Sequence, residues 1–392
     1  MQAQSSDHTV KRDAGGPVKA LYVHIPFCRS KCAYCDFYSL SDHHELAEAC
    51  IRAISLELRR QAHHLTVPLD SIFVGGGTPT AVQLPLLEEL LEMLAEYRDR
   101  KTEFSIEANP CTITGEVANS LKNAGVNRIN IGAQSFVEEE LTALGRIHGP
   151  NEIVTAWETL RQAGHKRLGL DLIYAAPDQN PDSWRFSLDK ALSLEPDHLS
   201  CYALTIAGDT DLGRRRNSGE FVEMDESDQA ECYHAAVTTA RAAGLPQYEI
   251  SNFAAPEKRC RHNLTYWRNE SYLGLGPAAT SYIGGVRRTN KPDLEAYIQA
   301  LETGNEPPFH SEKLTGRAEM GETVMLALRT IEGVDRRKFV ARFAVDLPEA
   351  FERSIQRYRS QGVLQLTPTH LRIAPDAMLV SNTIMADILA EV

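Results

Sequence analysis

Short runs of consecutive apolar residues alternate, along the first half of the chain, with longer segments whose apolar positions recur every three to four residues. The short runs are typical of strands buried on both faces of a parallel sheet. The longer segments are typical of helices with one apolar face. The pattern predicts strands at 20–25, 71–74, 103–107, 128–131, 168–174 and 198–204, and helices near 46–58, 84–97, 114–124, 137–145, 151–163 and 181–194.

Six strand–helix alternations predict parallel βαβ units, and right-handed crossovers would curl them into a barrel or an open barrel. The expected fold class is therefore α/β, with a partial (β/α)6 barrel of the TIM type. A complete eight-unit barrel is the alternative. A doubly wound sheet is disfavoured because glycine and polar residues recur at the ends of many strands, where barrel active sites lie.

The pattern changes in the second half of the chain. A helix over 225–243 and a strand over 247–253 are followed by a glycine-containing region, and then by three helices and a hairpin over 363–373. Three helices and a hairpin resemble a winged-helix module of α+β class. The predicted division is a mobile tail over 1–18, a core barrel over 19–255, a linker region over 256–313 and a C-terminal domain over 314–392, with helices near 315–329, 335–343 and 348–361.

The composition narrows the class of protein. The chain has 392 residues, of which 43% are hydrophobic and 24% charged, as in ordinary globular proteins. A net charge of −12 disfavours nucleic-acid binding, which needs a basic face. No apolar run approaches the length of a membrane span or a secretory signal. The eight cysteines are therefore expected in a reducing cytoplasm rather than in disulfides.

Three cysteines, Cys28, Cys32 and Cys35, form a C-x3-C-x2-C run directly after the first predicted strand. Thiolates at this spacing can each hold a different iron of a cubane cluster. Four irons and three thiolates leave one iron open to a substrate or cofactor. A structural zinc site is the alternative, and it needs a fourth ligand. Ligands near in sequence are His24, His43, His44 and Cys50.

Polar residues and glycines follow several of the predicted strands. The second strand runs into Gly75–Thr78, where glycines would let a ligand approach the backbone closely. Any one of the polar residues could be a surface residue or a helix cap. Together with the cysteine loop they predict one site at the C-terminal end of the barrel. The polar residues are Glu107, Gln134, Arg146 and Asp171.

The cysteine loop resembles that of the radical S-adenosylmethionine (SAM) superfamily. This resemblance implies a [4Fe–4S] cluster on Cys28, Cys32 and Cys35, with the methionine part of SAM on the fourth iron. It also implies that an electron from the cluster splits the sulfonium and releases a 5′-deoxyadenosyl radical. The residues that it implies for the SAM cradle are Tyr22, Tyr34, Gly76, Gly77, Thr78, Glu107, Gln134, Arg146 and Asp171.

Longer motifs resemble one branch of that superfamily, the oxygen-independent coproporphyrinogen III oxidases and the related HemW haem chaperones. These motifs are Tyr22–Cys28, Gly75–Thr80, Ile106–Pro110, Gly132–Phe136 and Asp171–Tyr174. The resemblance extends to the C-terminus and implies a C-terminal domain like that of the oxidases.

Two features favour the chaperone branch. Phe37 stands where the oxidases have a fourth cysteine, and His262-Asn-Leu-Thr-Tyr266-Trp267 fits the H-N-x-x-Y-W motif of the chaperones. The resemblance implies that His262 is an axial haem ligand, with the two aromatic residues covering the porphyrin. From the residues alone, a buried histidine satisfied by hydrogen bonds is the alternative, with both aromatic residues at a domain interface. Cys260 is either a second soft ligand or part of the packing.

The resemblance implies a radical SAM-type haem chaperone with a [4Fe–4S] cluster, SAM and haem. Its partners would be an electron donor and acceptor haemoproteins, with respiratory acceptors at the membrane surface and a homodimer both left open. The alternative function is coproporphyrinogen III oxidation to protoporphyrinogen IX, and a third is radical SAM chemistry on an unrelated substrate. Two departures from the family pattern are Thr280, in place of a histidine, and Ala207, in place of a glutamate.

Overall fold

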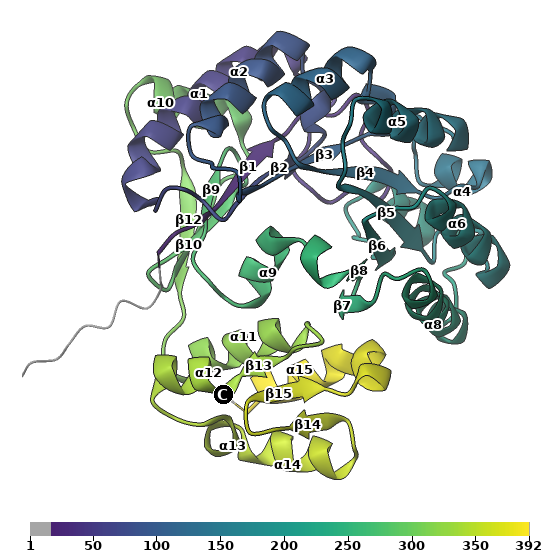
Figure 1. Ribbon diagram of the computed structural model, residues 1–392, viewed down its shortest axis with the longest axis vertical. Helices are drawn as coiled ribbons and strands as arrows, with labels where there is room; N and C mark the ends of the chain where they lie inside the picture. Colours follow the sequence, from purple (N-terminus) through teal and green to yellow (C-terminus); the bar gives the residue numbers. More distant parts are fainter. Residues whose placement is uncertain (1–16, 392) are drawn as a thin grey trace, which may run out of the picture.

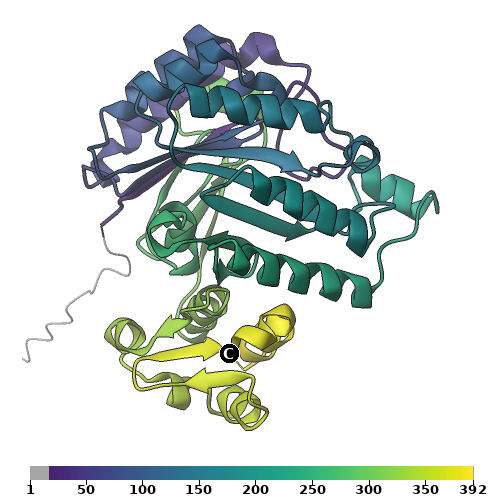
Figure 2. The same cartoon turned by 45° about the vertical axis from the view of Figure 1, so that its right-hand side comes forward.

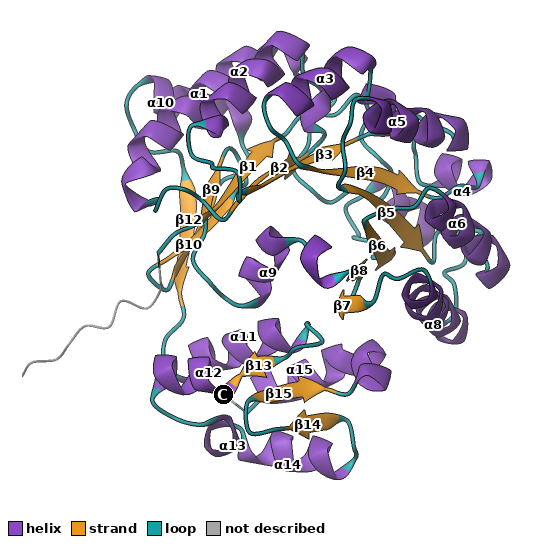
Figure 3. Cartoon of the chain, in the orientation of Figure 1, coloured by secondary structure: helices purple, strands orange, loops and turns teal. Residues whose placement is uncertain are grey.

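One open, curved sheet forms the centre of the molecule (Figure 3). The structure is a computed structural model that describes residues 17–391. Nine strands lie in the order β7–β8–β6–β5–β4–β3–β2–β1–β9, and β1 to β6 pair in parallel. This confirms the predicted α/β fold with a partial barrel. The first six strands are Ala20–Ile25 (β1), Ser71–Gly76 (β2), Glu103–Ala108 (β3), Arg128–Gln134 (β4), Leu168–Tyr174 (β5) and His198–Ala203 (β6).

Helices cover the convex face of this sheet in a continuous arc (Figure 1). Their apolar sides pack on the strands, so that the hydrophobic core lies between the helices and the sheet. This is why the sequence shows strands rich in apolar residues beside amphipathic helices. The helices of the arc are Ala47–Gln61 (α1), Leu84–Ala95 (α2), Gly115–Asn123 (α3), Glu138–Ala143 (α4), Pro150–Gln162 (α5), Pro181–Ser193 (α6), Glu226–Ala242 (α8) and Leu294–Glu302 (α10).

Short strands extend the sheet at both edges. The single strand predicted over 247–253 is in fact two strands, β7 (Gln247–Glu249) and β8 (Asn252–Ala254), with β8 antiparallel to β6. At the other edge β9 (Leu273–Leu275) pairs in parallel with β1. The sequence analysis did not predict β9, because three apolar residues carry too little periodicity to identify a strand.

The segment 256–313 belongs to the core and is not a linker, which corrects the predicted division. Its helix α9 (Arg261–Trp267) lies in the hollow of the curved sheet, and α10 packs on α1 (Figure 1). A second sheet contains β10 (Thr280–Ile283), β11 (Val286–Asn290) and β12 (Phe309–Lys313). The buried carboxylate of Glu57 on α1 accepts hydrogen bonds from Gly276 N, Asn290 Nδ2 and Tyr297 Oη of this segment.

The C-terminal domain lies beneath the barrel as a separate layer (Figures 1 and 2). Its three-stranded sheet has the order β13–β15–β14, and helices pack around it as in the predicted winged-helix-like module. The predicted helix over 348–361 is two helices, because the chain bends at the buried Phe351. The elements are Arg317–Leu328 (α11), Val334–Asp335 (β13), Arg336–Phe343 (α12), Leu347–Ala350 (α13), Glu352–Ser360 (α14), Leu364–Leu366 (β14), His370–Ile373 (β15) and Ser381–Leu389 (α15).

Backbone hydrogen bonds and one aromatic contact join this domain to the barrel. Ile250 N donates to the carbonyl of Arg329 and Ile331 N donates to that of Tyr248, each over 3.1 Å. The Arg329 guanidinium lies over the Trp267 ring of α9, 4.8 Å from its centre. The domain is thereby docked against α9.

The start of the chain departs from the predicted tail at one residue. Residues 1–16 of that tail lie outside the described residues. Val18 is buried, and its carbonyl accepts a hydrogen bond from Thr66 N over 2.9 Å. Within residues 17–391, no helix has both the length and the apolar character needed to cross a membrane.

Candidate functional site

The cysteine loop follows β1 at the C-terminal end of the barrel. Cys28 N donates to the carbonyl of Leu40 over 2.9 Å, which closes the loop on itself. Its other side is fixed at Ala33, whose N donates to Leu144 O and whose carbonyl accepts from Leu212 N of α7 (Asp211–Asn217). All three cysteines of the loop are free and partly exposed. The fold therefore presents three thiols on one short, anchored loop.

Arg146 lies against this loop from the connection between α4 and α5. Its Nη1 donates to the sulfur of Cys32 over 3.0 Å, and its Nη2 donates to the carbonyl of Gly132 over 2.7 Å. The Arg146 Nε is buried and has no partner among the described residues. Burial raises the pKa of Cys28, while the Thr78 hydroxyl and Arg146 oppose that rise. A guanidinium here favours thiolates, the form that binds iron.

The strand β2 ends in the glycines predicted to approach a ligand. Gly76 has a φ of +106°, and a Cβ there would lie 2.7 Å from the His24 ring. A Cβ on Gly77 would lie 2.7 Å from the carbonyl oxygen of Phe27 in the cysteine loop. Thr78 follows, with its hydroxyl 3.6 Å from the Cys28 sulfur. The glycines are thus required by close packing between β2 and the cysteine loop.

Two carboxylates face the hollow of the barrel from β3 and β5. Asp171 accepts a hydrogen bond from Asn130 Nδ2 over 2.9 Å, and Glu107 accepts one from Gly76 N over 3.3 Å. They line a cavity of about 270 Å3 together with Tyr22 and Arg128. Burial, together with the charge of Asp171, raises the pKa of Glu107 to about 8. The structure therefore brings the predicted acidic residues together.

The predicted residue Gln134 sits at an irregularity of β4. The pairing of β4 with β5 shifts between Gly132 and Gln134, and Gln134 has a φ of +70°. A left-handed conformation in a residue with a side chain is costly and is concentrated at functional sites. The bulge places Gln134 beside Gly132, whose carbonyl accepts from Arg146. The last predicted residue, Tyr34, lies in the cysteine loop, and burial raises its pKa.

Arg128 and Asn130 of β4 were missed as site residues. Both are buried in the barrel cavity, where Arg128 Nε and Nη2 and Asn130 Oδ1 have no hydrogen-bond partner among the described residues. Buried polar atoms are normally paired, so these atoms mark a place where a polar ligand fits. The signal in the sequence was the polar residue at every second position of an otherwise apolar strand.

His262 lies at the opposite, N-terminal end of the barrel, on the inner side of α9. Its side chain is 0% exposed and packs against the Phe73 ring, with 5.3 Å between ring centres. Nδ1 is 2.9 Å from the Ser71 hydroxyl and Nε2 is 2.8 Å from the Tyr266 hydroxyl. Burial lowers the pKa of His262 to about 3, so the ring is neutral. This geometry is that of a histidine satisfied by hydrogen bonds.

The two aromatic residues of the His262 motif lie in different environments. Tyr266 borders the barrel cavity, whereas Trp267 packs beside Tyr248 and Leu264 at the junction with the C-terminal domain. Cys260 is buried, with its sulfur 3.7 Å from Glu103 Oε1. In this conformation, none of these residues presents an open ligand atom beside His262.

The residues weighed as a fourth zinc ligand have other partners. His24 Nε2 is 2.8 Å from the carbonyl of Tyr38, and His44 Nε2 is 2.9 Å from that of Cys28. Cys50 is buried in the core. In the described part of the chain, no three His, Cys, Asp or Glu side chains are arranged around a single ion position. His24 and His44 therefore each engage one ring nitrogen with a backbone carbonyl.

The two departures from the family pattern lie near the cysteine loop. Thr280 on β10 lines a cavity of about 330 Å3 together with Tyr22, His24 and Phe37. Its hydroxyl is 2.8 Å from that of Thr289. Phe37, two residues after the third cysteine, is 65% exposed. Ala207 accepts hydrogen bonds from Thr210, which caps α7.

The chain matches known families and proteins over most of its length. Residues 22–191 match the radical SAM superfamily and residues 314–380 match the HemN C-terminal domain. The heme chaperone HemW of Bacillus subtilis (strain 168) is 31% identical over 378 residues, which cover 95% of this chain and 100% of that protein. The heme chaperone HemW of Escherichia coli (strain K12) is also 31% identical, over 96% of this chain and 99% of that protein.

A solved structure shows the same fold. The coproporphyrinogen III oxidase HemN from Escherichia coli, described as a radical SAM enzyme, superposes with a TM-score of 0.83. The superposition covers 97% of this chain and 92% of that one, at 22% sequence identity. It therefore includes both the barrel and the C-terminal domain.

Proposed function

The chain belongs to the family of the heme chaperone HemW, within the radical SAM superfamily, and from this premise we propose that it binds haem and delivers it to acceptor haemoproteins. The observation that carries the proposal is the match to HemW proteins along nearly the whole of both chains. Phe37, in place of the oxidases' fourth cysteine, supports the chaperone over the oxidase.

The family implies a [4Fe–4S] cluster and SAM, and the residues at the C-terminal end of the barrel fit both. Three free thiols share one anchored loop, and Arg146 donates to one of their sulfurs. We propose Cys28, Cys32 and Cys35 as the cluster ligands. When bound, the cluster and SAM supply one-electron chemistry. Arg146 favours the thiolate form, and the glycines at the end of β2 let this strand pack closely against the cysteine loop.

The polar residues of the barrel cavity suit the charged methionine end of SAM. Glu107 and Asp171 offer carboxylates to an ammonium or sulfonium, while Arg128 has unpaired buried donors for a carboxylate. Aromatic and backbone groups at the cysteine loop complete the proposed cradle. Its members are Tyr22, Tyr34, Gly76, Gly77, Thr78, Glu107, Gln134, Arg146 and Asp171.

The haem ligand is a separate proposal. His262 fits the chaperone motif, but its ring is enclosed and both of its nitrogens are engaged. Ligation by His262 therefore requires that Tyr266 release Nε2 or that Ser71 release Nδ1, beside the barrel cavity that His262 helps to line. That rearrangement is part of any mechanism in which His262 holds the iron.

One observation favours a second function. The full-length superposition on HemN gives this chain the fold of an oxygen-independent coproporphyrinogen III oxidase. That reaction removes carbon dioxide from two propionate side chains after hydrogen abstraction. The absence of a fourth cysteine at Phe37 argues against it.

The proposed partners are haem, an electron donor and acceptor haemoproteins, in a reducing cytoplasm that suits an exposed cluster. Respiratory acceptors at the membrane surface and a homodimer are both compatible with this role. Nucleic acid does not fit a chain with a net charge of −12.

One experiment tests the function. The protein, reconstituted anaerobically with iron and sulfide, is titrated with haem and is then given coproporphyrinogen III, SAM and a reductant. A chaperone binds haem and leaves coproporphyrinogen intact. Formation of protoporphyrinogen IX at ~1 per second or faster, a rate typical of enzymes, would replace the chaperone with the oxidase.

A further inference from the structure

Tyr266 forms part of the wall between two cavities. The barrel cavity of about 270 Å3 and the cavity of about 330 Å3 beside the cysteine loop both have Tyr22 and Tyr266 among their lining residues. Each volume lies near the lower end of the range for ligand sites, roughly 300–1,000 Å3. Together the two cavities offer about 600 Å3, so a displacement of this wall creates one space well within that range.

The cavity beside the cysteine loop, which we call the aromatic cavity, suits a flat ligand. Aromatic rings bury large areas and stack on other ring systems, so a cavity that they line favours a planar aromatic molecule. Phe37 is 65% exposed, so this side of the cavity can be reached from solvent. Five of the nine lining residues are Phe or Tyr, namely Tyr22, Phe37, Tyr38, Tyr266 and Tyr272.

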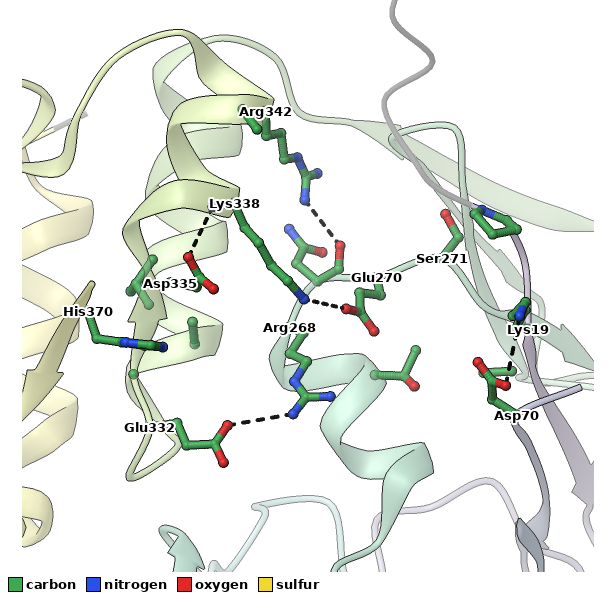
Figure 4. A pocket seen from close by; sticks show the side chains of 18 of the residues that line it. Lys19, Asp70, Arg268, Glu270, Ser271, Glu332, Asp335, Lys338, Arg342 and His370 are labelled. Carbon is green, nitrogen blue, oxygen red and sulfur yellow. Dashed lines mark hydrogen bonds and ion pairs between the residues drawn. The ribbon is translucent and has the colours of Figure 1, made fainter. Parts of the chain in front are cut away.

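A cleft on the outer side of α9 differs in its lining (Figure 4). It lies between α9 and the C-terminal domain, and the side chains around it include Arg268, Glu270, Glu332, Lys338 and His370. Among the described residues that line this cleft, none is Phe, Tyr or Trp. The aromatic cavity therefore suits a porphyrin better than the cleft does.

His262 already has the hydrogen-bond pattern of a metal ligand. Its Nε2 is 2.8 Å from the Tyr266 hydroxyl, and its Nδ1 is 2.9 Å from the Ser71 hydroxyl. When the tyrosine hydroxyl donates to Nε2, the ring proton is on Nδ1 and is donated to Ser71 Oγ. A histidine that binds a metal through Nε2 has this tautomer, with its other ring N–H donated to an oxygen. The Tyr266 hydroxyl thus occupies the position that iron would take.

Tyr266 is the easier of the two shared wall residues to move. Tyr22 belongs to β1, which is paired on both sides, and its hydroxyl is 3.1 Å from His24 Nδ1. Tyr266 lies in the last turn of the seven-residue helix α9 and is partly exposed. The hydrogen bond of its hydroxyl is the one to His262. Rotation of the Tyr266 side chain therefore breaks this bond and leaves the backbone of α9 in place.

From these observations we propose that Tyr266 is the gate of the haem site. Its rotation frees Nε2 of His262 for the iron and joins the two cavities around the porphyrin. The porphyrin then lies in the aromatic cavity, against Phe37 and Thr280. The proposal rests on the function proposed above, and it specifies which side chain opens the site and where the porphyrin lies. It also places the haem beside the cysteine loop, since Phe37 stands two residues after Cys35.

The first test removes a single hydroxyl from the gate. Ferric haem is titrated into reconstituted full-length wild type, Tyr266→Phe and the control Tyr97→Phe, with the Soret band as the readout. Tyr266→Phe keeps the ring, but its hydrogen bond no longer competes with the iron, so we expect haem to bind about three- to tenfold more tightly. Tyr97→Phe should match the wild type, because the Tyr97 hydroxyl has no hydrogen-bond partner among residues 17–391.

The second test fills the aromatic cavity. Thr280→Trp places an indole among its lining residues, and we expect haem affinity to fall at least about tenfold. The matched control is Thr289→Ala, since the Thr280 and Thr289 hydroxyls are 2.8 Å apart and both variants lose this contact. Thr289→Ala adds no ring and should bind haem as the wild type does. Iron content, SAM binding and far-ultraviolet circular dichroism are measured on every variant.

The outcomes separate this proposal from the function on which it rests. A wild type that binds no haem overturns the chaperone function and the gate with it. Haem binding by the wild type, with unchanged affinity in either Tyr266→Phe or folded Thr280→Trp, leaves the function standing and overturns the gate. Loss of SAM binding in Thr280→Trp, with haem binding kept, assigns the aromatic cavity to SAM and also overturns it.

A substitute variant covers the case in which Thr280→Trp does not fold. Phe37→Ala removes an exposed ring from the same cavity, and we expect it to weaken haem binding about threefold or more. Tighter binding in Tyr266→Phe, together with weaker binding in Thr280→Trp or in its substitute, supports the gate. Wild-type affinity in Phe37→Ala would place the porphyrin outside the aromatic cavity.

Discussion

The two ends of the barrel differ in whether their ligand-type side chains already have partners within the protein. At the C-terminal end, three thiols lie partly exposed on one loop, and the buried Nε of Arg146 has no partner within residues 17–391. At the N-terminal end, α9 closes the barrel, and both nitrogens of His262 are engaged. The buried carboxylate of Glu103 there accepts from the backbone N of Arg261 over 2.8 Å and pairs with Arg167 over 3.0 Å.

This difference teaches how to separate a ligand site from a structural contact. A buried polar group without a protein partner is costly, so it is retained where a ligand supplies the partner. A buried polar group with all its partners stabilises the fold and has nothing left to offer a ligand. By this criterion the C-terminal end is incomplete without its cofactors. At the N-terminal end His262 has both ring nitrogens engaged, whereas Arg128 keeps its Nε and Nη2 unpaired among the described residues.

The largest effect is expected when the three thiols at the C-terminal end of the barrel are removed. The triple variant Cys28→Ala, Cys32→Ala and Cys35→Ala should bind no iron after anaerobic reconstitution, whereas the wild type should bind about four irons per chain. The measurement is iron and sulfide content with the electron paramagnetic resonance spectrum. Stoichiometric zinc in the wild type, without uptake of iron, would contradict the cluster.

The second prediction tests whether His262, at the N-terminal end of the barrel, stabilises the fold. His262→Ala leaves a cavity and removes the partners of the Ser71 and Tyr266 hydroxyls, so we expect a loss of about 3–5 kcal/mol in the free energy of unfolding. Urea denaturation measures it, with His310→Ala as an exposed control that should change by less than about 0.5 kcal/mol. Wild-type stability in His262→Ala would show that α9 does not depend on this ring.

A smaller effect probes the cavity between the two ends. The pKa of Glu107 is raised from 4.5 to about 8, so the folded state binds this proton more tightly than the unfolded state. Its contribution to stability is therefore complete below about pH 4.5 and is lost as the pH rises to about 8. We expect the free energy of unfolding to fall by on the order of 2 kcal/mol between about pH 5 and pH 8.

The matched variant for this pH dependence is Glu107→Gln, which keeps the shape of the side chain and removes its titration. Its free energy of unfolding should vary less with pH over the same window, as followed by urea denaturation at several pH values. An equally steep slope in Glu107→Gln would assign the dependence to another group, with Asp171→Asn as the next variant to examine.

The smallest effect is expected on the outer side of α9, in contrast to His262 on its inner side. Arg268 follows α9 directly and faces the cleft, with a side chain that is 45% exposed and 3.6 Å from Glu332. Arg268→Ala should change the free energy of unfolding by less than about 1 kcal/mol, because exposed ion pairs contribute little. The same urea series measures it. A loss as large as that of His262→Ala would mean that the outer side of α9 is also essential to the fold.

Much of the barrel could be predicted because its signals are local. Each strand from β1 to β6 is a short segment rich in apolar residues, although polar residues interrupt β3, β4 and β6, and each predicted helix of the arc carries its own periodicity. The sequence did not predict β9, which is too short for a pattern and is fixed by pairing with β1, about 250 residues earlier. For the same reason the segment 256–313 was expected to be a linker, although its contacts with Glu57 make it part of the core.

The candidate site also has features that local sequence predicts and features that depend on distant residues. Sequence by itself determined the three cysteines on one loop, the glycines after β2 and the acidic residues at strand ends, because spacing and chain order fix them. Only the tertiary structure decided which polar atoms have partners: it joined Arg146 to Cys32, enclosed His262 against Ser71 and left His370 facing a cleft. Whether a polar group has a hydrogen-bond partner depends on residues far away in the chain, and a local sequence pattern does not show which distant residues come together.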